Sequence, residues 1–264
     1  MKNHTRSYPY YISIFLTALG YLSYFISIVC FLGIIVPVII VLGFFPKNRR
    51  RFARGTLKRY LFFLTRRLLP FLQVYSIDEI SGFTRLTSPC IFAANHRGRL
   101  DALLLLSILE KTGVLIKSKY CRFALYRMFV KYLDFIAIDP DTPAGIAAAM
   151  HRCKELIGLG HNILVFPEGA RAASGKLLPF KKFVFRLAIA TGLPVIPVII
   201  HSDYPFMAKR PGSIFPKNKL RYTLRCLDPI FNTQGQRSVD FAGAVRKRIA
   251  VELTALDKGT VWEI

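Results

Sequence analysis

The sequence predicts an α/β fold, in which a mixed, mostly parallel sheet is flanked by helices and preceded by an N-terminal membrane-embedded helical segment. Short apolar runs typical of buried strands alternate with helical runs from residue 89 to residue 256, which favours a sheet with helices on its faces. Residues 10–45 contain no charged side chain and are mostly Ile, Leu, Val and Phe. No internal repeat or second boundary interrupts residues 73–264, so we expect one globular domain there.

The N-terminal segment, residues 1–45, is expected to anchor the chain in a membrane. Its apolar run exceeds the roughly 20 residues that one spanning helix needs, but it is shorter than two spans with a turn. Gly33 and Pro37 allow a bend, so a single long tilted helix and a re-entrant hairpin both remain open. A cleaved signal peptide is disfavoured, because the run is too long and no small-x-small site follows it.

Residues 46–72 form a basic and aromatic segment. The cations that follow the anchor are Lys47, Arg49, Arg50, Arg51, Arg54, Lys58 and Arg59. They outweigh Lys2 and Arg6 on the other side, so the charge bias places the following domain on the cytoplasmic face of the inner membrane. Such cations also attract anionic headgroups. The aromatic and aliphatic residues between 60 and 72 fit either an interfacial helix or the first core helix.

Composition indicates the class of partner. Lys plus Arg number 38 and Asp plus Glu 15, which gives a net charge of +23 in a chain that is 53% hydrophobic. A chain that is both basic and apolar favours an anionic membrane surface. Nucleic acid is not expected as a partner, since proteins that bind it rarely carry a long uninterrupted apolar segment.

Within residues 73–264 the predicted elements alternate. The predicted strands are 89–94, 113–117, 135–138, 162–166, 195–200 and 220–226, and the predicted helices are 102–109, 145–159, 183–190 and 239–256. This alternation places the end of the first strand directly before the first helix. Catalytic groups of α/β sheets are often found at such junctions.

Two short blocks carry the candidate chemistry. The first, NHRGRLD, lies at this junction and places His96 and Asp101 five positions apart. A turn that enters a helix can bring them within hydrogen-bonding reach, so that Asp101 orients His96 as a general base. The spacing alone also arises by chance, and a structural histidine is then the alternative. The second block, FPEGAR, adds Glu168 and Arg171, which can hold a charged substrate. Together the blocks indicate acyl transfer to a hydroxyl.

These blocks, followed by SGKLLPFK from Ser174 and LPVIPV from Leu193, resemble in order and spacing the signature blocks of the 1-acylglycerol-3-phosphate acyltransferase family. The resemblance to these lysophospholipid acyltransferases covers about residues 55–230. It implies that His96 is the general base and that Asp101 orients it. It also implies that Glu168 and Arg171 help to bind the glycerol phosphate of the acceptor, and that a two-helix membrane motif precedes the domain.

Further residues of the blocks are candidates for substrate contacts. They are Asn95, Arg97, Arg99, Gly169, Lys181 and Lys182. Cations among them would bind phosphate and compensate for Pro140, which stands where the family usually has Arg. Ala170 in place of Thr and Phe183 in place of Gly are two more departures. They leave two acceptors open: 1-acylglycerol-3-phosphate, which would give phosphatidic acid, or another lyso-lipid such as an aminolipid or a saccharolipid.

The expected acyl donor is a thioester, either acyl-CoA or acyl-carrier protein. Because a thioester is already activated, the reaction needs no cofactor, no metal and no covalent intermediate. The other histidines lack metal-ligand spacing, and neither a Walker loop nor a Gly-x-Gly-x-x-Gly motif is present. Cys90 precedes an apolar strand and is expected to be a buried structural thiol. A non-catalytic membrane-surface adaptor is the alternative from another class, and the presence of all four chemical residues speaks against it.

Overall fold

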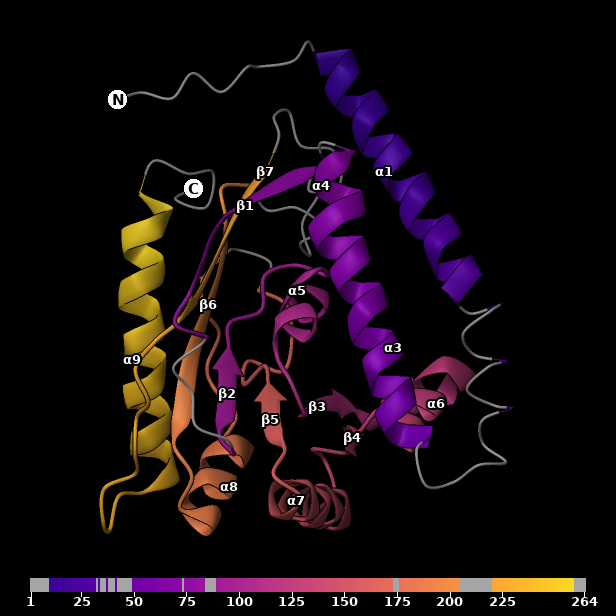
Figure 1. Ribbon diagram of the computed structural model, residues 1–264. Coiled ribbons are helices and arrows are strands. Elements are labelled where there is room, and N and C mark those ends of the chain that lie inside the picture. Colours follow the sequence, from indigo (N-terminus) through magenta and orange to yellow (C-terminus); the bar gives the residue numbers. More distant parts are fainter. Residues whose placement is uncertain are drawn as a thin grey trace.

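The computed structural model describes residues 10–31, 33, 37, 41, 49–72, 74–83, 89–172, 176–204 and 220–258. The strands are β1 (Tyr75–Ser81), β2 (Ile91–Ala94), β3 (Thr112–Lys117), β4 (Phe135–Ile138), β5 (Asn162–Val165), β6 (Val195–Ser202) and β7 (Leu220–Cys226). They form one sheet with the order β1-β7-β6-β2-β5-β3-β4 (Figure 1). The last five in this order are parallel to one another, whereas β7 is antiparallel to β6 and parallel to β1. The prediction of a mixed, mostly parallel sheet is confirmed.

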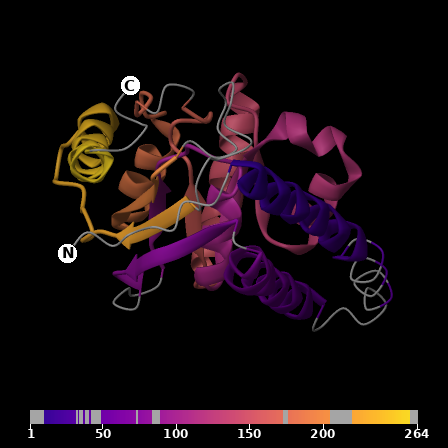
Figure 2. The same cartoon turned by 90° about the horizontal axis from the view of Figure 1, so that it is seen from above.

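Helices cover both faces of the sheet. They are α1 (Tyr10–Cys30), α3 (Arg49–Phe63), the π-helix η3 (Leu64–Leu68), α4 (Leu69–Phe71), α5 (Asp101–Ile108), the 3-10 helix η5 (Ser118–Arg122), α6 (Ala124–Tyr132), α7 (Pro143–Gly158), α8 (Phe183–Thr191) and α9 (Ser238–Asp257). On one face, Leu64 and Leu104 pack in a core with Phe92. On the other, Phe185 and Phe241 meet edge to face, with ring centroids 5.6 Å apart. Helix α9 therefore lies away from α1 and α3 (Figure 1; Figure 2).

The strands and helices predicted within residues 73–264 are all present, and no end differs by more than two residues. Helix α7 begins two residues early because Thr142 caps it: the Gly145 N–H donates to the Thr142 hydroxyl at 3.1 Å, and Pro143 suits the first turn. The sequence does not predict β1 or α6. Both are largely only half-buried: charged side chains interrupt the apolar pattern of β1, whereas α6 is a short amphipathic helix of nine residues.

The predicted N-terminal anchor is described only in part. Helix α1 ends at Cys30, and residues 1–9, 32, 34–36, 38–40 and 42–48 lie outside the described residues. Among the helices that the structure describes, none is both long and apolar enough to cross a membrane. The prediction of a membrane-spanning helix over residues 10–45 is therefore not confirmed. Helix α1 packs on α3, where the rings of Phe31 and Tyr60 stack at 4.3 Å and the Ser27 hydroxyl lies 3.0 Å from that of Tyr60.

The basic and aromatic segment divides between core and surface. Leu61, Leu64 and Leu69 are buried in or beside the core, whereas Phe62 and Phe63 are exposed. The buried side of residues 60–72 agrees with the interpretation as a core helix, and the interfacial interpretation of the exposed side stays a prediction. Some of the predicted lipid-facing cations have protein partners instead, since the Lys58 ammonium lies 2.6 Å from the Glu110 carboxylate and Arg54 pairs with Asp134. Lys47 lies outside the described residues.

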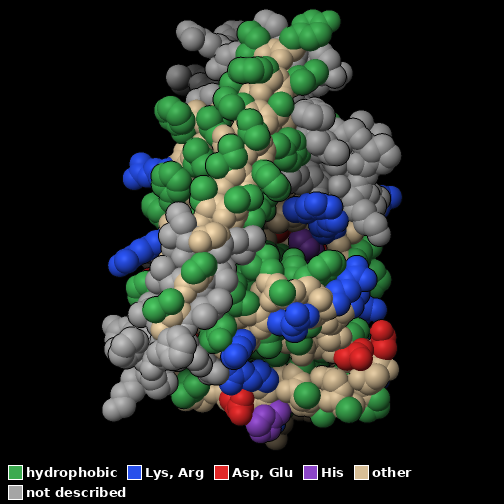
Figure 3. Space-filling model, turned by 90° about the vertical axis from the view of Figure 1, so that its right-hand side faces the viewer, with side chains coloured by type: hydrophobic (Ala, Val, Ile, Leu, Met, Phe, Trp, Pro, Cys, Tyr) green, Lys and Arg blue, Asp and Glu red, His purple; other side chains and the backbone are tan. Residues whose placement is uncertain are grey.

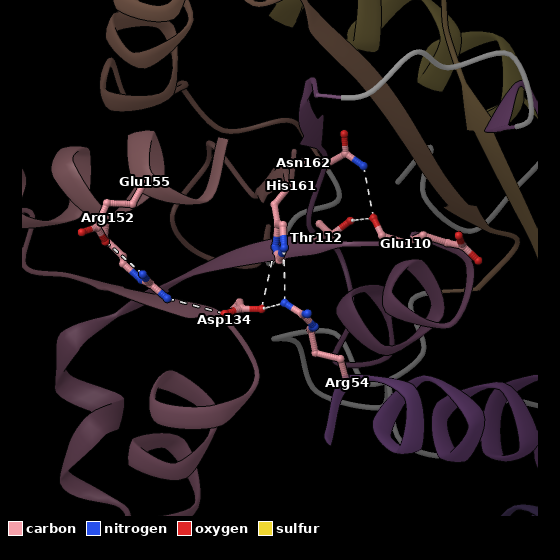
Figure 4. Close-up of polar contacts among 8 residues, drawn as sticks. All are labelled: Arg54, Glu110, Thr112, Asp134, Arg152, Glu155, His161 and Asn162. Atoms are coloured by element: carbon pink, nitrogen blue, oxygen red, sulfur yellow. Dashed lines mark hydrogen bonds and ion pairs between the residues drawn. The ribbon is translucent and has the colours of Figure 1, made fainter. Parts of the chain in front are cut away.

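A buried polar cluster fastens α3 to the amino-terminal edge of the sheet (Figure 4). Asp134, directly before β4, pairs with Arg54 of α3 and lies 3.5 Å from the Arg152 guanidinium of α7. His161, directly before β5, has its Nε2 atom 3.3 Å from Arg54 Nη1. A guanidinium only donates, so this nitrogen accepts and the imidazole is neutral. Burial lowers the pKa of His161.

Candidate active site

The first block forms the loop between β2 and α5, at the carboxyl edge of the parallel strands. His96 Nδ1 lies 2.8 Å from Asp101 Oδ2. The same oxygen accepts hydrogen bonds from the backbone N–H groups of Arg97 at 2.7 Å and Gly98 at 2.8 Å. Asp101 is the first residue of α5, where the helix dipole favours a negative charge. This buried carboxylate therefore closes the loop and orients the imidazole, as the spacing predicts.

The His96 ring is held in one orientation. It packs on the ring of Phe166 from the second block, with centroids 4.4 Å apart and an interplanar angle of 31°. Because a carboxylate only accepts, Nδ1 carries the proton and Nε2 keeps its lone pair. The His96 side chain is 22% exposed. Nε2 is therefore the nitrogen available to take a proton from a substrate hydroxyl.

Glu168 joins the two blocks. Its Oε1 accepts the His96 backbone N–H at 2.7 Å, and its Oε2 accepts the Leu178 N–H at 2.8 Å. The residue is 4% exposed. Burial raises the pKa of Glu168, and the two backbone donors oppose this shift. The structure thus places Glu168 beneath the loop, and the predicted contact with the acceptor would have to displace one of these hydrogen bonds.

Two other predicted substrate contacts also have protein partners. The Asn95 amide is buried and exchanges two hydrogen bonds of 2.8 Å with the backbone of Ile200 in β6. The Arg97 guanidinium binds both carboxylate oxygens of Asp257, at the end of α9, at 2.7 and 2.5 Å. The motif alone does not predict these two partners, because each lies more than 100 residues away in the sequence. These side chains hold the loop, and their placement gives no support for direct phosphate binding.

Two lysines flank the turn of the second block. Gly169 has a φ of +67°, which suits glycine, and its N–H donates to the Phe166 carbonyl at 3.0 Å. A Cβ added there would lie 3.7 Å from Lys181 Cγ and 4.0 Å from Lys117 Cε, so these two lysines flank the turn. Sequence reasoning missed Lys117, although it ends a parallel strand at the same edge as His96.

Other cations are more accessible. Arg99 and Lys182 are exposed, and Arg171 is half-buried. Figure 3 shows a hollow on the side of the molecule that carries α1 and α3, with a histidine side chain on its floor and Lys or Arg side chains at its rim. A cationic rim above a histidine suits an anionic substrate whose reacting group must reach the base.

The three departures from the family pattern occupy different places. Pro140 is exposed and follows β4, so it lies at the same carboxyl edge of the sheet as His96. Strands β5 and β3 separate β4 from β2, which puts β4 about 14 Å from β2. Ala170 is exposed in the turn of the second block. Phe183 begins α8 and packs against the core of that face. Of the three departures, Ala170 thus lies in the second block, Phe183 lies against the core, and Pro140 lies on the surface at the carboxyl edge of the sheet.

Cys90 is buried, as the sequence predicts, and its thiol lies 3.3 Å from Asn162 Oδ1. Burial raises its pKa to about 12, so it remains protonated at neutral pH and is not a thiolate nucleophile. In the part of the chain that the structure describes, no three His, Cys, Asp or Glu side chains are placed to hold a metal ion.

Known proteins that resemble this chain match it over the residues that form the site. A family model described as Acyltransferase matches residues 73–201, which contain both blocks. A chloroplastic 1-acyl-sn-glycerol-3-phosphate acyltransferase of Brassica napus is 27% identical over 175 residues, or 65% of this chain and 49% of that protein. A putative 1-acyl-sn-glycerol-3-phosphate acyltransferase of Caenorhabditis elegans is 31% identical over 149 residues, or 56% and 52%. The part of the chain that contains both blocks, residues 73–201, thus resembles this acyltransferase family.

A solved structure shares the fold of this chain. The crystal structure of the 1-acyl-sn-glycerophosphate acyltransferase of Thermotoga maritima superposes with a TM-score of 0.69 at 19% identity, over 92% of this chain and 95% of that one. The chain spans about half the length of the curated relatives it matches. The resemblance inferred from the motifs is therefore confirmed at the level of family and fold.

Proposed function

We propose that this acyltransferase moves a fatty acyl group from a thioester donor, acyl-CoA or acyl-carrier protein, to the free hydroxyl of a lysophospholipid. The proposed acceptor is 1-acylglycerol-3-phosphate and the product is phosphatidic acid. The observation that carries the proposal is the 2.8 Å contact between His96 Nδ1 and Asp101, which leaves Nε2 as an oriented base. The names of the relatives, which are enzymes for this acceptor, support the choice of substrate.

The reaction follows from this geometry. His96 Nε2 takes the hydroxyl proton as the acceptor oxygen forms a bond to the thioester carbonyl carbon. The carbon–sulfur bond then breaks, and the proton on His96 passes to the leaving sulfur, which departs as a thiol. Asp101 keeps the ring in place and stabilises the imidazolium between these two transfers. Proton transfer therefore needs only residues of this chain.

The acceptor phosphate is proposed to lie beside the turn at Gly169. Lys117 and Lys181 flank that turn, and Arg171 follows it. Charge-assisted contacts from such cations position a phosphate more strongly than neutral hydrogen bonds do. A headgroup held there would bring its hydroxyl toward His96, because the turn and the His96 loop share Glu168.

A second candidate keeps this chemistry but changes the acceptor to another lyso-lipid, such as an aminolipid or a saccharolipid. The observation that favours it is Pro140, which offers no donor where relatives in the family usually have Arg. The side chain cannot form a charge-assisted contact with a phosphate monoester.

We also propose that the enzyme binds an anionic membrane through α1 and α3. Large apolar side chains are exposed on both helices: Tyr11, Phe15, Leu22, Phe25, Ile26 and Val29 on α1, and Phe52, Phe62 and Phe63 on α3. Figure 3 shows hydrophobic side chains along this side, with Lys and Arg side chains nearby. Apolar groups beside cations suit the headgroup region of anionic lipids. The cytoplasmic placement of the domain remains a prediction from charge bias.

An in vitro assay tests the activity. Purified enzyme is given labelled acyl-CoA or acyl-carrier protein with a panel of lyso-lipids, and the products are identified by mass spectrometry. We expect 1-acylglycerol-3-phosphate to be converted to phosphatidic acid, and His96→Ala to lower turnover by at least about a hundredfold. His151→Ala is the matched control, because His151 is 77% exposed on α7. Near-normal turnover by His96→Ala, or no transfer to any acceptor, would refute the proposal.

Vesicle co-sedimentation tests the membrane surface. We expect the enzyme to prefer vesicles that contain phosphatidylglycerol over neutral ones, and less so at high salt. Phe62→Ser/Phe63→Ser should weaken binding, whereas Val239→Ser/Val251→Ser on α9, on the other side of the molecule, should not. Equal binding by both double variants would show that this surface is not the membrane contact.

A further inference from the structure

A buried charged network joins the catalytic loop to the last helix of the fold. The Arg97 guanidinium makes two parallel hydrogen bonds to Asp257, and Arg97 is 5% exposed. His201 of β6 lies on the other side of that carboxylate, with Nε2 3.2 Å from Asp257 Oδ1. The pairing with Arg97 helps to hold the pKa of Asp257 below its usual value, even though burial opposes this shift. The carboxylate is therefore fixed by the Arg97 guanidinium, and the His201 imidazole lies beside it.

Arg97, which follows His96, is held through both its backbone and its side chain. The Arg97 backbone N–H donates to Asp101 Oδ2 at 2.7 Å, while its side chain reaches Asp257. His96 precedes it, and Gly98, whose N–H also donates to Asp101, follows. A displacement of Arg97 would therefore move His96 and loosen the contacts of the carboxylate that orients it.

Stability alone does not explain such a pair. Desolvation of two charges roughly cancels their attraction, and apolar residues of equal volume often give the same or greater stability. A bidentate guanidinium–carboxylate pair does, however, fix the relative position of the two groups. At a loop that carries a general base, geometry affects rate, because a shift of about 1 Å can cost on the order of a hundredfold.

We propose that Asp257 is a positioning residue for acyl transfer, which fixes the His96 loop through the Arg97 guanidinium. The inference rests on the proposed function for its effect on rate. It assigns to the C-terminal helix, outside the signature blocks, a part in orienting the base.

The test combines steady-state kinetics with hydrogen–deuterium exchange of the whole enzyme. We expect Asp257→Asn to lower kcat by about tenfold or more with KM changed by less than about twofold, and to raise deuterium uptake over residues 95–101. Asp257→Glu should restore part of kcat. The matched control is Asp240→Asn in the same helix, which removes an exposed pair with Arg237 at 2.9 Å and should change neither readout.

A double variant separates geometry from stability. Arg97→Met/Asp257→Leu removes both charges with little change in volume, so it should recover the melting temperature lost in Asp257→Asn while kcat stays low. Recovery of kcat together with the melting temperature would overturn the proposal, as would an Asp257→Asn enzyme with normal kcat and normal uptake. If the wild-type enzyme transfers no acyl group, the proposed function fails, and deuterium uptake still decides whether Asp257 fixes the loop.

Discussion

Glu168→Gln is the sharpest test of how the two blocks depend on each other. Glu168 accepts one backbone N–H with each carboxylate oxygen, from His96 at 2.7 Å and from Leu178 at 2.8 Å. A glutamine has nearly the same shape but replaces one acceptor with an NH₂ donor. One of the two amides must therefore face another donor, in a site from which water is largely excluded.

The magnitude follows from that single lost acceptor. A buried donor without a partner costs about 1–3 kcal/mol. In a domain of this size each kcal/mol lowers the melting temperature by about 2–4 °C, so we expect a fall of about 2–12 °C. Because one of the affected amides belongs to His96, kcat should also fall by about ten- to a hundredfold.

The assay is thermal unfolding followed by circular dichroism, together with kcat on the same preparation. Glu110→Gln is the control, because Glu110 is 80% exposed and its pair with Lys58 should contribute less than about 1 kcal/mol. Glu168→Gln with the melting temperature and kcat of this control would refute the bridging role assigned to Glu168.

Three further predictions concern other parts of the molecule. Asp101→Asn should lower kcat at least about a hundredfold, since a neutral amide cannot stabilise the imidazolium; a tenfold effect or less would argue against the His96 pair. Because the folded pKa of His161 is lowered below its unfolded value of about 6.5, the unfolded chain binds more protons and stability is lost as pH falls through that region. His161→Gln should therefore flatten the melting temperature between about pH 7.5 and 5, and parallel curves for the two proteins would contradict this. Pro140→Arg should raise kcat/KM for 1-acylglycerol-3-phosphate relative to lyso-lipids without a terminal phosphate by about tenfold or more; an unchanged ratio in an enzyme that already prefers the phosphate would remove the support for another acceptor.

The sequence predicts the elements of the sheet well where burial is one-sided or complete. All four residues of β2 and of β5 are buried, and in the sequence β2 is an unbroken apolar run and β5 is apolar after Asn162. Strand β1 lies at the edge of the sheet and carries two charged side chains, Asp78 and Glu79, that interrupt its apolar pattern, whereas α6 is an amphipathic helix of only nine residues with no fully buried residue. Whether such an element forms depends on tertiary contacts, which local sequence patterns do not contain.

The same distinction applies to the site. His96 and Asp101 were predictable because five residues of one turn bring them together. The partners of Asn95, Glu168 and Arg97 were not, because a buried polar group must be satisfied but the sequence does not say by which distant group. All three are directed to the protein's own backbone or to Asp257. These three motif residues thus hold the loop that carries His96 in place.

The stacking of Phe166 against His96 has an energetic consequence. A neutral imidazole 4.4 Å from an aromatic ring gains mainly dispersion, whereas an imidazolium also interacts with the negative face of that ring. This added attraction, about 0.5–1 kcal/mol where water remains close, exists only while the proton resides on His96. An interaction that strengthens as charge develops lowers a barrier, while one that is equal before and after does not. In the proposed reaction, Phe166 of the FPEGAR block thus favours the charged ring over the neutral one.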